Sequence, residues 1–196
     1  ARERHPGPIL ARCHGLHTSM PTSHALGRCS ADVERAPSTA VRDRCSDARM
    51  SERYDLARFV RAQDAPANGG TTYEMALAEL RAGEKKTHWM WFIFPQLRGL
   101  GTSEMSLKYA VVSLGEARAY ITHPVLGPRL RECVATLNGL EDRTAFQIFG
   151  RPDDRKFRAC ITLFGYASGD NKVFEAALNR FFPGGVDKQT VKMLGF

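Results

Sequence analysis

The chain has 196 residues, of which 43% are hydrophobic, and its formal net charge is +7 at pH 7. No apolar run approaches the length of about 18 residues that a transmembrane helix needs, so the composition excludes a membrane protein and predicts one globular domain plus additional chain. The positive charge is spread along the sequence, with +3 in residues 1–49 and +4 in residues 50–196. Nucleic acid is therefore not indicated as the main partner.

Residues 1–49 differ in composition from the rest of the chain. None of the 18 aromatic residues lies there, whereas three of the five cysteines and four of the six histidines do. Such a segment buries too little apolar surface to offset an ordering entropy of about 1–2 kcal/mol per residue. We predict a disordered tail over 1–49, a translation start at Met50, and one helical domain over 50–196. A chain that starts at Met50 should then melt at the same temperature.

The cysteines and histidines do not indicate a metal or a secreted protein. The tail has no C-x-x-C or H-x-x-x-H spacing that would close a zinc site, and it has no apolar secretory leader. The two remaining cysteines, Cys133 and Cys160, stand at core-facing helical positions. We therefore expect reduced thiols, a cytoplasmic location, no metal and no cofactor.

From Met50 onwards, almost every segment has the period of an amphipathic helix. The first helix is expected at about 53–64 and is broken by Asn68-Gly69-Gly70. A second helix opens with the capping-box spacing of Thr71 and Glu74 and stops at Gly83.

The next segment contains both tryptophans in a continuous apolar run, Trp89 to Phe94. Thr87 can cap a short helix that Pro95 ends, although a buried strand fits the same run. Trp91 lies near the centre of the run, so we expect Trp91→Ala to destabilise the domain by about 3–5 kcal/mol.

The remainder of the chain shows further helix starts and stops. Candidate N-caps are Thr102 or Ser103, Ser113, Thr144, Asp170 and Asp187, and Pro152-Asp153-Asp154 is a typical helix start. No β-hairpin, alternating strand or internal repeat is predicted. The fold class is therefore all-α, a single multihelical domain of roughly eight or nine short helices.

Several of these motifs together resemble a known family. They are His88 to Leu97, Tyr109-Ala110, His123 to Gly127, Phe149-Gly150, and Asp153-x-x-Lys156 followed by Thr162-Leu163-Phe164. The chain is similar over about Tyr54–Gly195 to the bacterial domain-of-unknown-function family 1810, sometimes mislabelled calpastatin. The resemblance implies a small helical cytoplasmic protein and no established activity. One departure is Ala159, where family members tend to carry Ser.

The best candidate for a binding loop follows the tryptophan run. Arg98, Gly99, Gly101, Thr102 and Ser103 arrive together at a helix start, where free N–H groups, hydroxyls and a guanidinium favour an anion. The alternative is an ordinary turn with a capped helix and an arginine paired to an acid.

Other candidates stand beside this loop. His88 is either an acid/base group in an apolar pocket or a histidine bonded to a backbone carbonyl, and Asp153 with Lys156 is either part of the site or a surface ion pair. No Ser-His-Asp arrangement, P-loop or H-E-x-x-H motif assigns a reaction, so the catalytic residues stay unknown.

Two functions follow from these candidates. In the first, the protein binds or processes a small anionic ligand such as a nucleotide. Trp89 or Trp91 would stack the base, the 98–103 loop would hold the phosphate, and His88 or Gln96 would fix orientation. In the second, the aromatic run is core and the protein is a non-enzymatic module that docks a protein partner. The two differ in whether His88, Gln96, Arg98 and Lys156 converge on one cavity.

Overall fold

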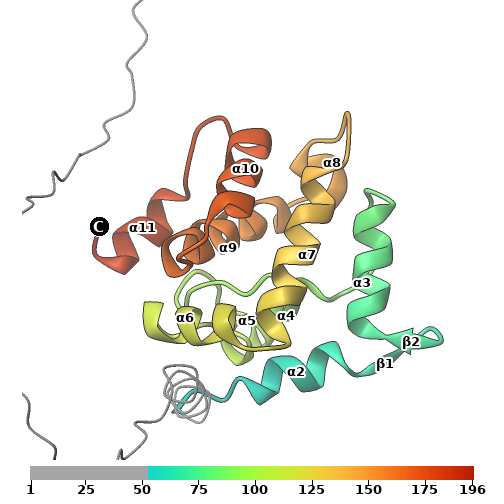
Figure 1. Ribbon diagram of the computed structural model, residues 1–196, viewed down its shortest axis with the longest axis horizontal. Helices are drawn as coiled ribbons and strands as arrows, with labels where there is room; N and C mark the ends of the chain where they lie inside the picture. The colour runs from blue at the N-terminus through green and yellow to red at the C-terminus, as the bar shows by residue number, and fades with distance from the viewer. Residues whose placement is uncertain (1–52) are drawn as a thin grey trace, which may run out of the picture. The chain divides into compact units, whose positions relative to one another are not determined.

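The computed structural model describes residues 53–196, and these residues are mostly helical (Figure 1). Ten helices lie in this part of the chain, against eight or nine expected, and the all-α prediction is confirmed. The elements are α2 (Ala57–Gln63), β1 (Pro66–Ala67), β2 (Gly70–Thr71), α3 (Thr72–Arg81), α4 (Met90–Ile93), α5 (Glu104–Lys108), α6 (Leu114–Thr122), α7 (Leu126–Asn138), α8 (Ala145–Phe149), α9 (Asp153–Ala167), α10 (Lys172–Phe181) and α11 (Lys188–Leu194). The predicted tail and the boundary at Met50 lie outside the described residues.

Most of the predicted helix starts are confirmed. The side-chain oxygen of each confirmed N-cap accepts a hydrogen bond from the backbone N–H three residues on; these caps are Thr71, Ser103, Ser113, Thr144 and Asp187. Asp170 was wrong as a cap, because α10 begins one residue later with Asn171 at its N-cap. Arg131 and Ser168 donate hydrogen bonds to the Asp170 carbonyl and hold it outside the helix.

A short hairpin was missed at the break after α2. β1 pairs antiparallel with β2, with Pro66 opposite Thr71 and Ala67 opposite Gly70. The connecting residues Asn68 and Gly69 have φ values of 45° and 85°. Positive φ at both central residues is the property that makes Asn-Gly favourable in a two-residue hairpin turn. The strands are too short to show the alternation by which strands are predicted.

The tryptophan run forms the helix α4 and not a strand, but Thr87 does not cap it. The Thr87 hydroxyl instead donates to Glu79 Oε1 at 2.7 Å, and the Trp89 indole N–H donates to Glu79 Oε2 at 2.8 Å. Trp89 is fully buried, whereas Trp91 is only partly buried. The core tryptophan is therefore Trp89 and not Trp91.

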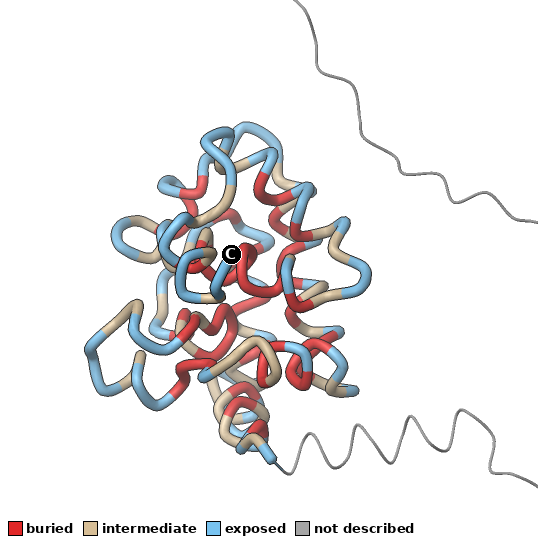
Figure 2. The backbone as a smooth tube through the Cα atoms, turned by 90° about the vertical axis from the view of Figure 1, so that its left-hand side faces the viewer, coloured by how far each residue is buried: buried red, intermediate tan, exposed pale blue. Residues whose placement is uncertain are grey.

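The helix α9 lies at the centre of the domain and contacts α6, α8, α10 and α11 (Figure 1). Eight of its 15 residues are buried, on more than one face, as expected for a helix that other helices surround. Its Phe157 packs with ring centroids 5.0 Å from both Phe94 and Phe149. Figure 2 shows the buried segments inside the domain and the exposed ones at its periphery.

Two further sequence predictions concern the core and the membrane. Cys133 and Cys160 are both buried and free, which confirms their core-facing positions. Within residues 53–196, no helix is both long enough and apolar enough to span a membrane.

Candidate functional site

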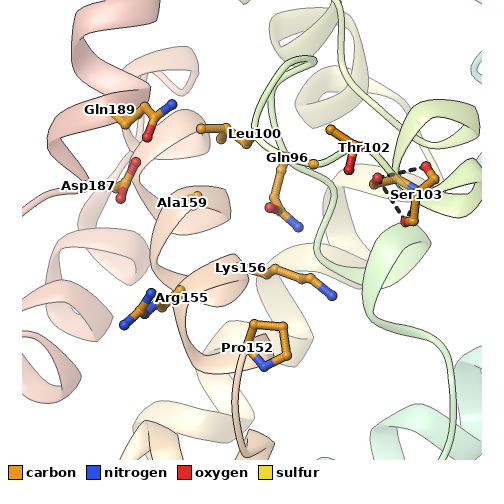
Figure 3. Close-up of a pocket in the computed structure, with 12 residues that line it drawn as sticks. Gln96, Leu100, Thr102, Ser103, Pro152, Arg155, Lys156, Ala159, Asp187 and Gln189 are labelled. Carbon is orange, nitrogen blue, oxygen red and sulfur yellow. Dashed lines mark hydrogen bonds between the residues drawn. The ribbon is translucent and has the colours of Figure 1, made fainter.

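A cavity of about 490 Å³ opens where three segments distant in sequence meet (Figure 3). One wall is the loop after α4 together with α5, the second is the first two turns of α9, and the third is the start of α11. The lining residues are Gln96, Leu100, Gly101, Thr102, Ser103, Ser106, Pro152, Arg155, Lys156, Ala159, Asp187 and Gln189. Eight of the twelve lining residues have polar side chains, so the cavity offers hydrogen-bonding groups to a ligand.

Backbone hydrogen bonds fix the loop that carries Gln96. The N–H of Val111 donates to the Gln96 carbonyl at 2.9 Å, and the N–H of Arg98 donates to the Val111 carbonyl at 2.8 Å. These two bonds form an isolated parallel bridge between Leu97 and Val111. Gln96 therefore projects from an anchored segment, and its amide points into the cavity in Figure 3.

Close packing and capping shape the rest of this wall. A Cβ added at Gly101 would lie 2.8 Å from Ser106 Oγ, so only glycine lets the loop approach α5 this closely. The hydroxyl of Ser103 caps α5 and lies 2.9 Å from the hydroxyl of Ser106. Thr102, Ser103 and Ser106 all line the cavity, but the Ser103 hydroxyl donates to that of Ser106, which in turn donates to the Ser103 carbonyl at 2.8 Å.

The α9 wall carries the positive charge. Lys156 donates to Asp153 Oδ1 at 2.8 Å, and its ammonium lies 4.9 Å from the centre of the Trp91 ring. Asp153 also pairs with Lys85 at 2.8 Å, and all three charged side chains are at most 22% exposed. Burial alone would raise the pKa of Asp153, but the bonds and charges of Lys156 and Lys85 outweigh it and hold that pKa below its ordinary value. Arg155, one residue before Lys156, is exposed at the rim.

The α11 wall carries the negative charge. Asp187 caps α11 by accepting hydrogen bonds at its Oδ2 from the N–H and the hydroxyl of Thr190, at 2.8 and 2.7 Å. Its own backbone N–H donates to the hydroxyl of the buried Thr162 on α9 at 2.9 Å. The bond to Thr162 thus fixes the position of Asp187 along the axis of α9, and Gln189 lies beside Asp187 in Figure 3.

A much smaller cavity of about 10 Å³ adjoins the large one and shares Gln96, Gly101 and Ser106 with it. Trp91 is one of its lining residues. The Trp91 indole nitrogen is buried and has no hydrogen-bond partner among the described residues. Buried indole N–H groups are usually paired, and the cavity beside this one has room for about one water molecule at most.

The structure brings together about half of the residues that the sequence proposed. Gln96, Gly101, Thr102, Ser103 and Lys156 line the large cavity, and Trp91 borders the small one. The others lie elsewhere: His88 and Gly99 are exposed and line neither cavity, Trp89 is in the core, and Arg98 lines a separate groove with Arg53 and Lys108.

The cavity also contains residues that sequence reasoning missed. Arg155 and Asp187 are the charged ones, and Ser106, Gln189 and Leu100 are further lining residues. The helix starts at Pro152 and Asp187 were both recognised from sequence. No signal in the sequence, however, indicated that these two starts meet the 96–103 loop.

Comparisons with known proteins give a family but no activity. The profile of the family described as "Protein of unknown function (DUF1810)" matches residues 53–194. A crystal structure of the conserved hypothetical protein Rv1873 from Mycobacterium tuberculosis is similar, with 47% sequence identity and a TM-score of 0.69. The match covers 74% of this chain and 99% of that one. No curated protein matches the chain.

Proposed function

The chain belongs to the family described as a protein of unknown function, DUF1810, and from the cavity itself we propose that it binds a small anionic ligand in the cytoplasm. The observation that carries the proposal is the cationic α9 wall, from which Lys156 points toward the loop that carries Gln96 and Thr102, with Arg155 at the rim. Cations with neutral hydrogen-bond donors opposite them are the groups that bind phosphate and carboxylate.

Lys156 is held in place before any ligand arrives. Its ion pair with Asp153 and its position above the Trp91 ring restrict its rotamers, so binding an anion costs less side-chain entropy. Asp153 is itself shared with Lys85, so it neutralises Lys156 only in part. The Lys85, Asp153 and Lys156 cluster keeps a net positive charge beside the cavity.

The expected affinity is modest. Hydrogen bonds to charged groups contribute roughly 1.5–3 kcal/mol each, so two cations supply about 3–6 kcal/mol. A dissociation constant of about 1 mM corresponds to about −4 kcal/mol. Inorganic phosphate should therefore bind in the millimolar range, and a ligand with more contacts should bind more tightly.

Calorimetric titration with inorganic phosphate tests the proposal. We expect Arg155→Ala to weaken binding about tenfold, and Lys156→Met to do the same while its stem still covers Trp91. Arg98→Ala is the matched control, because it removes one exposed arginine that does not line the cavity. Phosphate binding that survives both cavity substitutions, or that is absent at millimolar concentration, would refute the proposal.

The second candidate, a non-enzymatic protein-interaction module, draws support from exposed apolar side chains near the C-terminus. The rings of Tyr166 and Phe196 stack with centroids 5.0 Å apart, and Phe196 and Met193 are 69% and 41% exposed. Grouped exposed apolar residues are typical of docking surfaces. This candidate takes precedence if phosphate fails to bind.

A further inference from the structure

The charges of the cavity are separated along α9. Lys156 stands in the first turn of the helix, and the backbone of Asp187 is bonded to Thr162, six residues further on. At 1.5 Å per residue, the two positions are roughly 9 Å apart along the helix axis. Figure 3 shows Ala159 between them, so a small side chain leaves the space open from one end to the other.

The end beside α11 selects for hydroxyl groups and against a second anion. Oδ2 of Asp187 accepts two hydrogen bonds from Thr190, and an exposed amide, that of Gln189, lies beside this carboxylate. A carboxylate accepts hydrogen bonds from hydroxyls and repels phosphate or carboxylate groups. Side-chain amides donate and accept, as the hydroxyls of a polyol require.

Aromatic stacking is not the recognition mode of this cavity. None of the residues that line it is aromatic. Trp89 is in the core, and one face of the partly buried Trp91 lies beneath the Lys156 ammonium. A volume of about 490 Å³ is in the lower half of the usual range of roughly 300–1,000 Å³ for ligand pockets, which favours a small ligand.

We infer that the ligand is a phosphorylated polyol of pentose or hexose size. Lys156 would take its single phosphate, with Arg155 at the rim, and Asp187, Gln189 and Gln96 would take its hydroxyl groups. This inference rests on the proposed anion site and specifies the chemical class of the anion that it binds. The class accounts for a cationic end, a separate acceptor end beside α11, and the absence of an aromatic lining.

The test is calorimetric titration of the full chain with inorganic phosphate, ribose 5-phosphate, ribose and AMP. Ribose 5-phosphate should bind at least about tenfold more tightly than phosphate, and AMP no more tightly than ribose 5-phosphate. Asp187→Asn should weaken ribose 5-phosphate about tenfold and change phosphate binding by about twofold or less. Asparagine is as good an N-cap as aspartate, so α11 keeps its cap, and an unchanged melting temperature verifies this.

Asp170→Asn is the matched control, since it removes an exposed carboxylate that does not line the cavity and should leave all affinities unchanged. Equal affinity for phosphate and ribose 5-phosphate, with both dependent on Arg155, would overturn the sugar-phosphate inference and leave the anion site standing. Tighter binding of both ligands to Asp187→Asn would also overturn it, because the carboxylate would then act by repulsion alone. If no probe binds, the anion site and this inference fail together.

Discussion

Replacement of Trp89 is the most informative perturbation of the fold, because Trp89 and Trp91 stand two residues apart in very different environments. The Trp89 side chain is 0% exposed, and its ring lies 6.1 Å from Phe94 and 6.5 Å from Phe149. Its indole N–H also donates to Glu79 at 2.8 Å. Trp89→Ala should therefore destabilise the domain by about 3–5 kcal/mol, from lost burial and the cavity left behind.

Trp91→Ala should cost less, about 1–2 kcal/mol, because Trp91 is only partly buried and its indole nitrogen has no partner within residues 53–196. This replaces the larger cost that the sequence suggested for Trp91. Trp89→Phe keeps an aromatic ring but loses the bond to Glu79, at about 1–3 kcal/mol, together with the volume of the five-membered part of the indole.

The assay is urea unfolding followed by far-UV circular dichroism, which does not depend on the tryptophans as reporters. The slope of the transition should stay constant across the three variants, so that midpoint changes report stability. A cost below about 1 kcal/mol for Trp89→Ala, or an equal cost for Trp91→Ala, would show that the assignment of Trp89 to the core is wrong.

Three further predictions follow from buried charges and thiols. Glu116→Ala should lower the free energy of unfolding in urea by about 3–5 kcal/mol. It removes the carboxylate that lies 2.7 Å from the Arg58 guanidinium, which is only 14% exposed and would lose its charged partner. A loss below about 1 kcal/mol would contradict this. Burial tends to raise the pKa of Glu79, but hydrogen bonds from the 86–89 segment hold it below the ordinary 4.5. The ionised carboxylate of Glu79 therefore stabilises the fold fully above about pH 4.5, and this stabilisation is lost as the pH falls through the folded pKa. The difference in free energy of unfolding between wild type and Glu79→Gln should shrink in acid, and a constant difference would argue against the linkage. Burial raises the pKa of Cys133 to about 12 and also raises that of Cys160, so a thiol reagent should label both only after unfolding, and rapid native-state labelling would be the contrary result.

The helices of this protein follow from local sequence. Hydroxyl or carboxylate caps at Thr71, Ser103, Ser113, Thr144 and Asp187 are recognisable because an N-cap acts on a backbone N–H only three residues away. The same locality explains the failures. The cap at Asp170 is shifted because its carbonyl bonds to Arg131, 39 residues away, and Thr87 is diverted to Glu79 on another helix.

The candidate site was predictable only in part, for the same physical reason. Gln96, Gly101, Thr102 and Ser103 belong to one loop, so a sequence motif could identify them together. Lys156 was included with them because it belongs to a motif of the family resemblance, and not because of its spacing from the loop in the sequence.

Only the packing of the helices decided the composition of the cavity. The loop after α4 is anchored by backbone bonds to Val111, and the start of α11 by the bond between Asp187 and Thr162. These contacts bring Arg155 and Asp187 to the cavity and leave His88 and Arg98 outside it. A helix start can be recognised from residues within one turn, but which starts meet depends on how whole apolar faces pack, and no local pattern contains that information.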